Sequence, residues 1–263
     1  MFKTILARIQ QGHRTMAYPE GPPPPLPERF RGRPLIDRSR CPDGCRACAD
    51  ACPTGAISIG EDARVDLGKC LFCTDCQEAC PEGALAYSGD WRLATRERGQ
   101  LDIASTEEPV LAEALEARLR RLFGRSLRLR QVSAGGCNAC EADVNVLATV
   151  GWDIGRFGIQ VVASPRHADG ILVTGCVSEN MRGALEKTYA AVPPPKIVIA
   201  VGACAISGGP YLGSSAQHCG AGSTVPIDLY IPGCPPHPLT ILDGLLRLLG
   251  RIEGEGRHPG PVA

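Results

Sequence analysis

Cysteine is the residue type that dominates the chemistry available to this chain. Its 263 residues include 14 cysteines, and eight of these fall between residues 41 and 80. The first residues, MFKTILARIQ, lack the long apolar run and small-residue cleavage site of a secretory signal peptide. In a chain that is not exported, such dense cysteine spacing predicts metal binding rather than disulfide bonds.

The strongest motif is a cysteine run that occurs twice, each time ending in Cys-Pro. The second run, Cys70-x2-Cys73-x2-Cys76-x3-Cys80-Pro, has the spacing of bacterial ferredoxins with two 4Fe–4S clusters, in which three thiolates bind one cluster and the fourth reaches the other. The first run is one residue longer, between Cys41 and Cys45. Four-cysteine zinc sites are the alternative, but zinc ribbons do not use this spacing. We therefore expect two clusters, one held by Cys41, Cys45, Cys48 and Cys80 and the other by Cys70, Cys73, Cys76 and Cys52.

The later cysteines each follow an apolar, β-like run. The runs cover residues 127–132, 171–173, 197–201 and 229–231, and they precede Cys137, Cys176, Cys204 and Cys234. Short runs rich in Val and Ile, separated by helix-like segments, predict βαβ units. The expected fold class is α/β, a flavodoxin-like open parallel sheet, preceded by an α+β ferredoxin domain. Ligands of such sheets bind outside the carboxyl ends of the strands, where these cysteines would meet.

A third 4Fe–4S cluster is the interpretation we favour for this edge of the sheet. Cys137-x2-Cys140 alone is a weak motif, since redox dithiols and zinc half-sites share it. A dithiol site would leave Cys204 and Cys234 without a role, whereas a cluster uses all four thiols. For Cys176 we expect a small buried residue, with a nearby redox-active thiol as the alternative, and for Cys219 a free thiol.

The rest of the chain divides into recognisable segments. We expect an N-terminal amphipathic segment and proline-rich strap (1–34), the ferredoxin domain (35–90), a connector with a helix at 107–123 (91–126), the α/β domain (127–252) and a tail (253–263). The helix at 107–123 is predicted from leucines spaced four, four and three residues apart along one face: Leu111, Leu115, Leu119 and Leu122. Further helices are predicted at 140–150, 178–191 and 237–249. Residues 1–16 fit either a capping helix packed on its own protein or a basic element that docks on a membrane subunit or lipid. The strap over 18–34 is expected to be a spacer or to cover a partner.

Composition excludes several functions. Lys plus Arg and Asp plus Glu both total 28, so nothing indicates a nucleic-acid partner. No apolar run approaches the ~18 residues that span a bilayer, so we expect membrane association to be peripheral or through a partner. The chain has no P-loop and no G-x-G-x-x-G after a strand, and nucleotide binding is therefore not predicted.

Four segments in order, residues 133–141, 164–175, 202–209 and 230–238, resemble the small subunit shared by respiratory complex I and membrane-bound nickel–iron hydrogenases. The resemblance covers about residues 126–250, and it implies that Cys137, Cys140, Cys204 and Cys234 bind the 4Fe–4S cluster nearest the large subunit's active site. Complex I members carry an adjacent Cys-Cys pair, whereas hydrogenase-type members carry the spaced pair seen here. The N-terminal part, introduced by Phe30 to Pro34, resembles the two-cluster ferredoxin subunit of formate hydrogenlyase-like complexes.

The resemblance implies a role as well as a fold. We expect an electron-transfer subunit with three 4Fe–4S clusters, peripheral on the cytoplasmic face of the cell membrane. Its expected partners are a large catalytic subunit, an iron–sulfur protein or dehydrogenase as electron donor, and membrane subunits reached through a partner. A nickel-free complex-I-like quinone oxidoreductase is the alternative, and a ferredoxin-like binding module with a structural zinc domain is another. His167 and His237 are expected to orient loops. Glu141 is expected either to relay protons or to be a first-turn residue that the helix dipole stabilises.

Overall fold

A parallel sheet is the largest element of the fold. The computed structural model describes residues 2–12, 14–104 and 107–252, so the tail expected from residue 253 lies outside the described residues. The sheet has the order β10-β9-β8-β6-β7, and all its pairs are parallel. Its strands are β6 (Leu127–Ser133), β7 (Ile159–Val161), β8 (Gly170–Thr174), β9 (Ile197–Val201) and β10 (Leu229–Ile231). The predicted open parallel sheet is confirmed.

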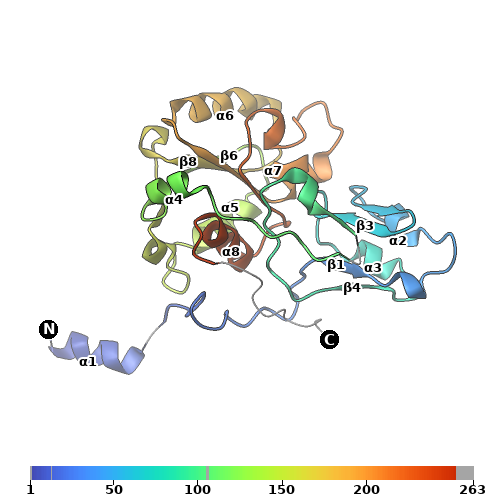
Figure 1. The fold of residues 1–263 in the computed structure, drawn as a ribbon, viewed down its shortest axis with the longest axis horizontal. Helices are drawn as coiled ribbons and strands as arrows, with labels where there is room; N and C mark the ends of the chain where they lie inside the picture. The colour runs from blue at the N-terminus through green and yellow to red at the C-terminus, as the bar shows by residue number, and fades with distance from the viewer. Residues whose placement is uncertain (1, 13, 105–106, 253–263) are drawn as a thin grey trace.

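Helices cover both faces of this sheet, which is why β8 and β9 are buried along their whole length. Figure 1 shows α6 (Glu179–Ala191) on one face and α5 (Ala139–Val146) with α8 (Pro238–Leu248) on the other. Successive side chains of a strand therefore pack on opposite faces of the sheet: Val173 packs on the α6 side, while Leu172 packs on the α8 side. The predicted helices at 140–150, 178–191 and 237–249 are therefore present, with ends shifted by up to four residues. The short helix α7 (Ala203–Ser207) follows β9.

The prediction of a helix over 107–123 is wrong for the first part of this segment. The structure has only α4 (Ala117–Phe123). Ahead of it the chain is extended, because its amides bond to distant carbonyls: Ala112 donates to Ala94 at 2.7 Å and Leu115 to Leu248 at 2.9 Å. Both side chains are buried. Packing against α8 and the connector has thus overridden the leucine spacing that favoured a helix.

The ferredoxin domain is built from short elements. Strands β1 (Pro34–Ile36) and β4 (Leu85–Tyr87) form one antiparallel pair. Strands β2 (Ile57–Ile59), β3 (Ala63–Asp66) and β5 (Asp102–Ala104) form a second antiparallel sheet. Helices α2 (Ala47–Asp50) and α3 (Asp75–Glu78) each have a single turn and carry cysteines. The connector thus supplies β5 to the ferredoxin domain, a pairing that the sequence analysis did not include.

The proline-rich strap packs on its own α/β domain. Met16 donates its amide to Gly151 at 3.0 Å, and Arg156 donates to the carbonyls of Met16 and Tyr18. Tyr18 is buried, and its hydroxyl donates to Asp243 of α8 at 2.7 Å. Burial and the Asp243 carboxylate raise the pKa of Tyr18, so the hydroxyl keeps its proton.

Helix α1 (Phe2–Gln11) projects from the body of the molecule (Figure 1). None of its described residues is buried, and its apolar side chains Phe2, Ile5, Leu6 and Ile9 are exposed. Among the described residues, no helix combines the length and apolarity needed to cross a membrane.

Candidate iron–sulfur sites

The two cysteine runs of the ferredoxin domain have the same local geometry. The amide of Ala56 donates to the Cys52 sulfur and that of Ala84 to the Cys80 sulfur, both at 3.2 Å. Gly55 and Gly83, with φ of 59° and 56°, make the turns that aim these amides. The sequence repeat is therefore also a structural repeat, with a backbone N–H directed at the last sulfur of each run.

Thiols from both runs gather around Cys70. Burial raises the pKa of Cys70 to about 12, and Cys76, Cys52 and Cys73 are close enough to raise it further. The Phe72 amide donates to the Cys70 sulfur at 3.3 Å. The four sulfurs predicted to hold one cluster are thus neighbours. We call them the inner thiol group: Cys52, Cys70, Cys73 and Cys76.

The other predicted ferredoxin set is Cys41, Cys45, Cys48 and Cys80, which we call the outer thiol group. Burial raises the pKa of Cys48, and Cys80 is among the thiols near enough to add to that effect. Cys41 lies in the loop before α2, with its sulfur 3.7 Å from the carbonyl oxygen of Asp37. The joint use of Cys41 and Cys45 with Cys48 and Cys80 stays a prediction.

The sheet-edge thiols come from three separate parts of the α/β domain. Cys137 precedes α5 and Cys140 lies in its first turn, Cys204 lies in α7 after β9, and Cys234 follows β10. Burial raises the pKa of Cys140, and Cys204, Cys234 and Cys137 are near enough to raise it further. Burial raises the pKa of Cys204 to about 12. The carboxyl ends of the strands therefore bring the four predicted thiols together.

Two glycines let the backbone approach these sulfurs. A Cβ added to Gly202, whose φ is 91°, would lie 2.5 Å from the Cys140 sulfur. A Cβ added to Gly209, whose φ is 55°, would lie 2.8 Å from the Cys204 sulfur. Local sequence patterns do not predict these contacts, because Gly202 is distant from Cys140 in the chain and Gly209 meets Cys204 only where the chain turns back after α7.

The donor set fits iron–sulfur clusters. Each group offers four cysteine sulfurs, the ligands of 4Fe–4S clusters. Burial disfavours bare thiolates here, so a positively charged metal centre is what would keep them deprotonated. Within residues 2–12, 14–104 and 107–252, no three His, Cys, Asp or Glu side chains are close enough to hold a single metal ion. The four sulfurs of each group, together with the amides that donate to the sulfurs of the ferredoxin groups, are the features that suit a cluster.

The inner thiol group faces the sheet-edge group. Cys73 is near enough to Cys234 to raise the pKa of that thiol, after burial and Cys137. A cleft of about 280 Å³ lies between the loop that carries Phe72 and the loop that carries Cys234 and Pro235. Phe30 of the strap also lines this cleft. Of the two ferredoxin groups, the inner thiol group is therefore the one that lies next to Cys234.

Glu141 is a buried anchor at the sheet edge. Its Oε1 accepts hydrogen bonds at 2.6 Å from Ser133 at the end of β6 and from Thr174 at the end of β8. Burial opposes ionisation of this carboxyl, but the hydrogen bonds from Ser133 and Thr174 lower its pKa. Its Oε2 is buried and finds no partner in the described part of the chain. Glu141 therefore holds α5, and Cys140 with it, against two strand ends, a role that the sequence did not indicate.

The remaining candidates occupy different surroundings. Cys176 is buried, with its sulfur 3.4 Å from the carbonyl of Gly135, and Cys219 is exposed. His237 caps α8 by accepting the Leu239 amide, and its ring packs edge-on against Phe30. His167 is exposed at the end of a short 3-10 helix (Pro165–His167) before β8. Functional roles for the two cysteines and for His167 stay predictions.

Comparisons with known proteins match both halves of the chain. Residues 40–84 match the model of the 4Fe-4S dicluster domain, and residues 137–248 match that of the NADH ubiquinone oxidoreductase 20 Kd subunit. Formate hydrogenlyase subunit 7 of Escherichia coli is 38% identical over 169 residues, which are 64% of this chain and 66% of that protein. A probable membrane-bound hydrogenase subunit, mbhJ, of Pyrococcus furiosus is 38% identical over 143 residues, 53% of this chain and 86% of that protein.

The relatives also include subunits of NADH-quinone oxidoreductases. One from Heliobacterium modesticaldum is 34% identical over 169 residues, 64% of this chain and 94% of that protein. Among solved structures, a chain of the archaeal membrane-bound sulfane sulfur reductase is 32% identical, with a TM-score of 0.45 over 52% of this chain and 75% of that one. The sequence relatives are thus named as subunits of oxidoreductase complexes.

Proposed function

Since the chain belongs to the family of the 20 kDa subunit of NADH ubiquinone oxidoreductase and carries a dicluster ferredoxin domain ahead of it, we propose that it is the iron–sulfur electron-transfer subunit of a membrane-associated nickel–iron hydrogenase. The supporting observation is the spaced pair Cys137 and Cys140, brought together with Cys204 and Cys234 beside the inner thiol group. Relatives named as hydrogenase subunits and relatives named as NADH-quinone oxidoreductase subunits both match. The spaced pair, typical of hydrogenase-type members, favours the first.

In this proposal the chain holds three 4Fe–4S clusters, one on each thiol group. A bound cluster would accept and release one electron at a time. The amides of Ala56, Ala84 and Phe72 donate to sulfurs of the ferredoxin groups and would stabilise the added negative charge. The electron would pass in the order outer, inner and sheet-edge group. Chemistry on hydrogen belongs to a large partner subunit, since no two further Cys-x2-Cys motifs remain in this chain for nickel.

Attachment to the membrane is part of the proposal. Helix α1 exposes Phe2, Ile5, Leu6 and Ile9 and carries Lys3 and Arg8, with no acidic residue. A basic amphipathic helix suits the anionic cytoplasmic surface of a membrane. Removing residues 1–11 is expected to lower cosedimentation with phosphatidylglycerol vesicles and leave the iron content unchanged. Unchanged cosedimentation would mean that the complex reaches the membrane through its other subunits.

The decisive experiment uses the native complex, purified anaerobically through a tag on this chain. We expect about twelve irons per chain, from three four-iron clusters, together with nickel and viologen-linked hydrogen evolution. Full iron without nickel or hydrogen would favour the nickel-free quinone oxidoreductase, with quinone reduction as the next assay. Zinc in place of the third cluster would favour the binding-module alternative.

A matched pair of variants tests the third site. Cys204→Ser should lower the iron content from about twelve to about eight, the loss of one cluster. Cys219→Ser removes an exposed thiol outside the three groups and should keep all the iron. Equal iron in both variants would refute the assignment of Cys204 as a ligand.

A further inference from the structure

The ferredoxin domain touches the α/β domain at a glycine. Gly68 lies two residues before Cys70 of the inner thiol group, and Ile206 lies two residues after Cys204 of the sheet-edge group. A Cβ added to Gly68 would lie 2.8 Å from Cγ2 of Ile206 and 2.8 Å from Cζ of Arg98. The loop backbone therefore rests directly on the helix that carries Cys204. Gly68 does not have the left-handed φ that requires glycine, so the constraint is space.

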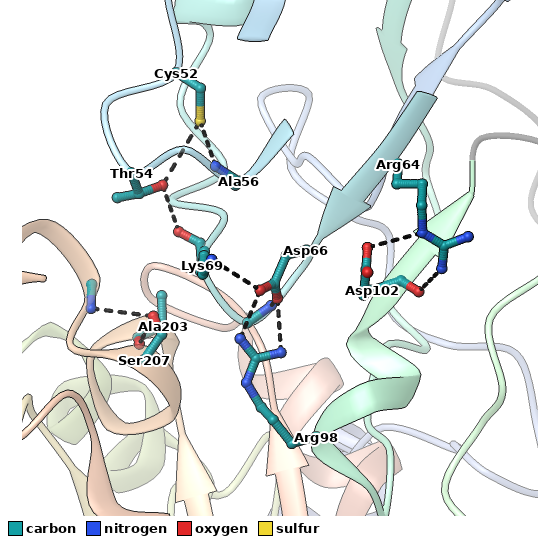
Figure 2. Close-up of polar contacts among 12 residues, drawn as sticks. Cys52, Thr54, Ala56, Arg64, Asp66, Lys69, Arg98, Asp102, Ala203 and Ser207 are labelled. Carbon is teal, nitrogen blue, oxygen red and sulfur yellow. Dashed lines mark hydrogen bonds and ion pairs between the residues drawn. The ribbon is translucent and has the colours of Figure 1, made fainter. Parts of the chain in front are cut away.

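An ion pair between Asp66 and Arg98 lies beside this contact. Both terminal nitrogens of Arg98 donate to the Asp66 carboxylate, at 2.8 and 2.7 Å (Figure 2). The Gly68 amide donates to the same carboxylate at 2.9 Å. Such a bidentate pair restricts orientation as well as distance. Asp66 thus holds the loop that leads into Cys70.

Arg98 is itself attached to the α/β domain. Two residues earlier in the connector, Arg96 donates to the Asp228 carbonyl at 2.9 Å. Thr95 exchanges two backbone hydrogen bonds with Tyr230 of β10, at 3.0 and 2.9 Å. The ion pair therefore ties the inner thiol loop to the edge of the parallel sheet, and the Gly68 contact ties it to α7.

The contact is continuous with the core of the ferredoxin domain. Ala205 and Ile206 of α7 are buried together with Leu67, Cys70 and Leu101 in one apolar cluster. On the opposite side, Thr54 donates to the Lys69 carbonyl at 2.8 Å and lies 3.8 Å from the Cys52 sulfur (Figure 2). The loop from 66 to 70 is thus held from both domains, next to two predicted ligands of one cluster.

We propose that Gly68, Ile206 and the Asp66–Arg98 pair form a spacer that sets the distance between the inner and sheet-edge clusters; this inference rests on the proposed function. In this transfer one electron passes from the inner cluster to the sheet-edge cluster, and no bond is made or broken. The rate of such a transfer depends steeply on separation. The spacer residues touch neither cluster; they are positioning residues.

A second ion pair on the same strands provides the control. Arg64 of β3 pairs with Asp102 of β5 at 3.4 Å (Figure 2), and the two side chains are 39% and 49% exposed. Its loss removes an Arg–Asp pair from the same small sheet without touching α7. Gly99 is the matching control for Gly68: it follows Arg98 directly, and no described atom lies within 4 Å of an added Cβ.

The test uses the full chain with its clusters reconstituted anaerobically. Gly68→Ala should leave the iron content unchanged and weaken the magnetic interaction between the two reduced clusters in electron paramagnetic resonance spectra. Electron transfer between them after flash reduction should slow several-fold. Arg98→Ala should act in the same direction, whereas Gly99→Ala and Arg64→Ala should behave as the unmodified chain.

A second-site change makes the test specific. Ile206→Ala removes Cγ2, one of the two side-chain contacts that a Cβ at position 68 would make, and leaves the contact with the Arg98 guanidinium. Gly68→Ala combined with Ile206→Ala should therefore recover part of the magnetic interaction. Unmodified coupling in Gly68→Ala, or no recovery in the double variant, would overturn the spacer. Fewer than three clusters in the unmodified chain would instead overturn the proposed function, and the spacer with it.

Discussion

The ferredoxin domain and the sheet edge present their thiols in opposite ways. In the ferredoxin domain eight cysteines lie within 40 residues, and three of them, Cys48, Cys70 and Cys76, are part of the apolar core. At the sheet edge the thiols span residues 137–234: Cys140 packs against the core of the α/β domain, whereas Cys137 and Cys234 are exposed. Three thiols thus form part of the interior of the ferredoxin domain, whereas none of the four sheet-edge thiols is fully buried.

Iron removal should separate the two regions most strongly. The ferredoxin domain has strands of three or four residues and helices of a single turn, too little for a metal-free fold of this size. Chelation under reducing conditions is therefore expected to abolish hydrogen-exchange protection over residues 40–84 and to retain it in β8 and β9. Mass spectrometry of the exchanged chain measures both. Equal loss in the two regions would remove the distinction.

A pair of glycine variants tests how tightly each site is packed. Gly202→Ala places a Cβ 2.5 Å from the Cys140 sulfur and should eliminate the third cluster, read as a loss of iron to about eight per chain. Gly55→Ala in the ferredoxin repeat also has positive φ, at 59°, but no described atom lies within 4 Å of its new Cβ. It should cost only about 1 to 2 kcal/mol of stability from backbone strain, with every cluster kept. Full iron in Gly202→Ala would contradict the tight packing inferred at the sheet edge.

The smallest expected effect concerns the strap. Tyr18→Phe removes the hydroxyl that donates to buried Asp243 at 2.7 Å, a hydrogen bond to a carboxylate worth about 1.5 to 3 kcal/mol. Chemical denaturation followed by tryptophan fluorescence should show the loss in the α/β domain, with unchanged iron in the ferredoxin domain. Tyr211→Phe, at a half-exposed tyrosine, is the control and should change stability little. Equal midpoints for the two variants would mean that the strap does not stabilise this domain.

Predictions from local sequence patterns were the most accurate for the strands of the parallel sheet. The short apolar runs rich in Val and Ile predicted the parallel sheet, because parallel strands buried on both faces have this composition. The leucine spacing over 107–123 gave a wrong prediction for the first part of this segment. The amides of Ala112 and Leu115 donate to the carbonyls of Ala94 and Leu248 instead of to carbonyls within a helix. Periodicity describes one segment, whereas these bonds depend on segments far away in the chain.

The sequence by itself determined the ligand chemistry: the number of thiols, their spacing in the ferredoxin runs, and their delivery to strand ends. Only the tertiary structure decided that the inner thiol group, rather than the outer one, faces Cys234, and that Gly68 rests on Ile206. The reason is physical. A turn of three or four residues positions a thiol through local backbone geometry, but the contact between two domains is set by the packing of all the elements between them, which no local spacing encodes.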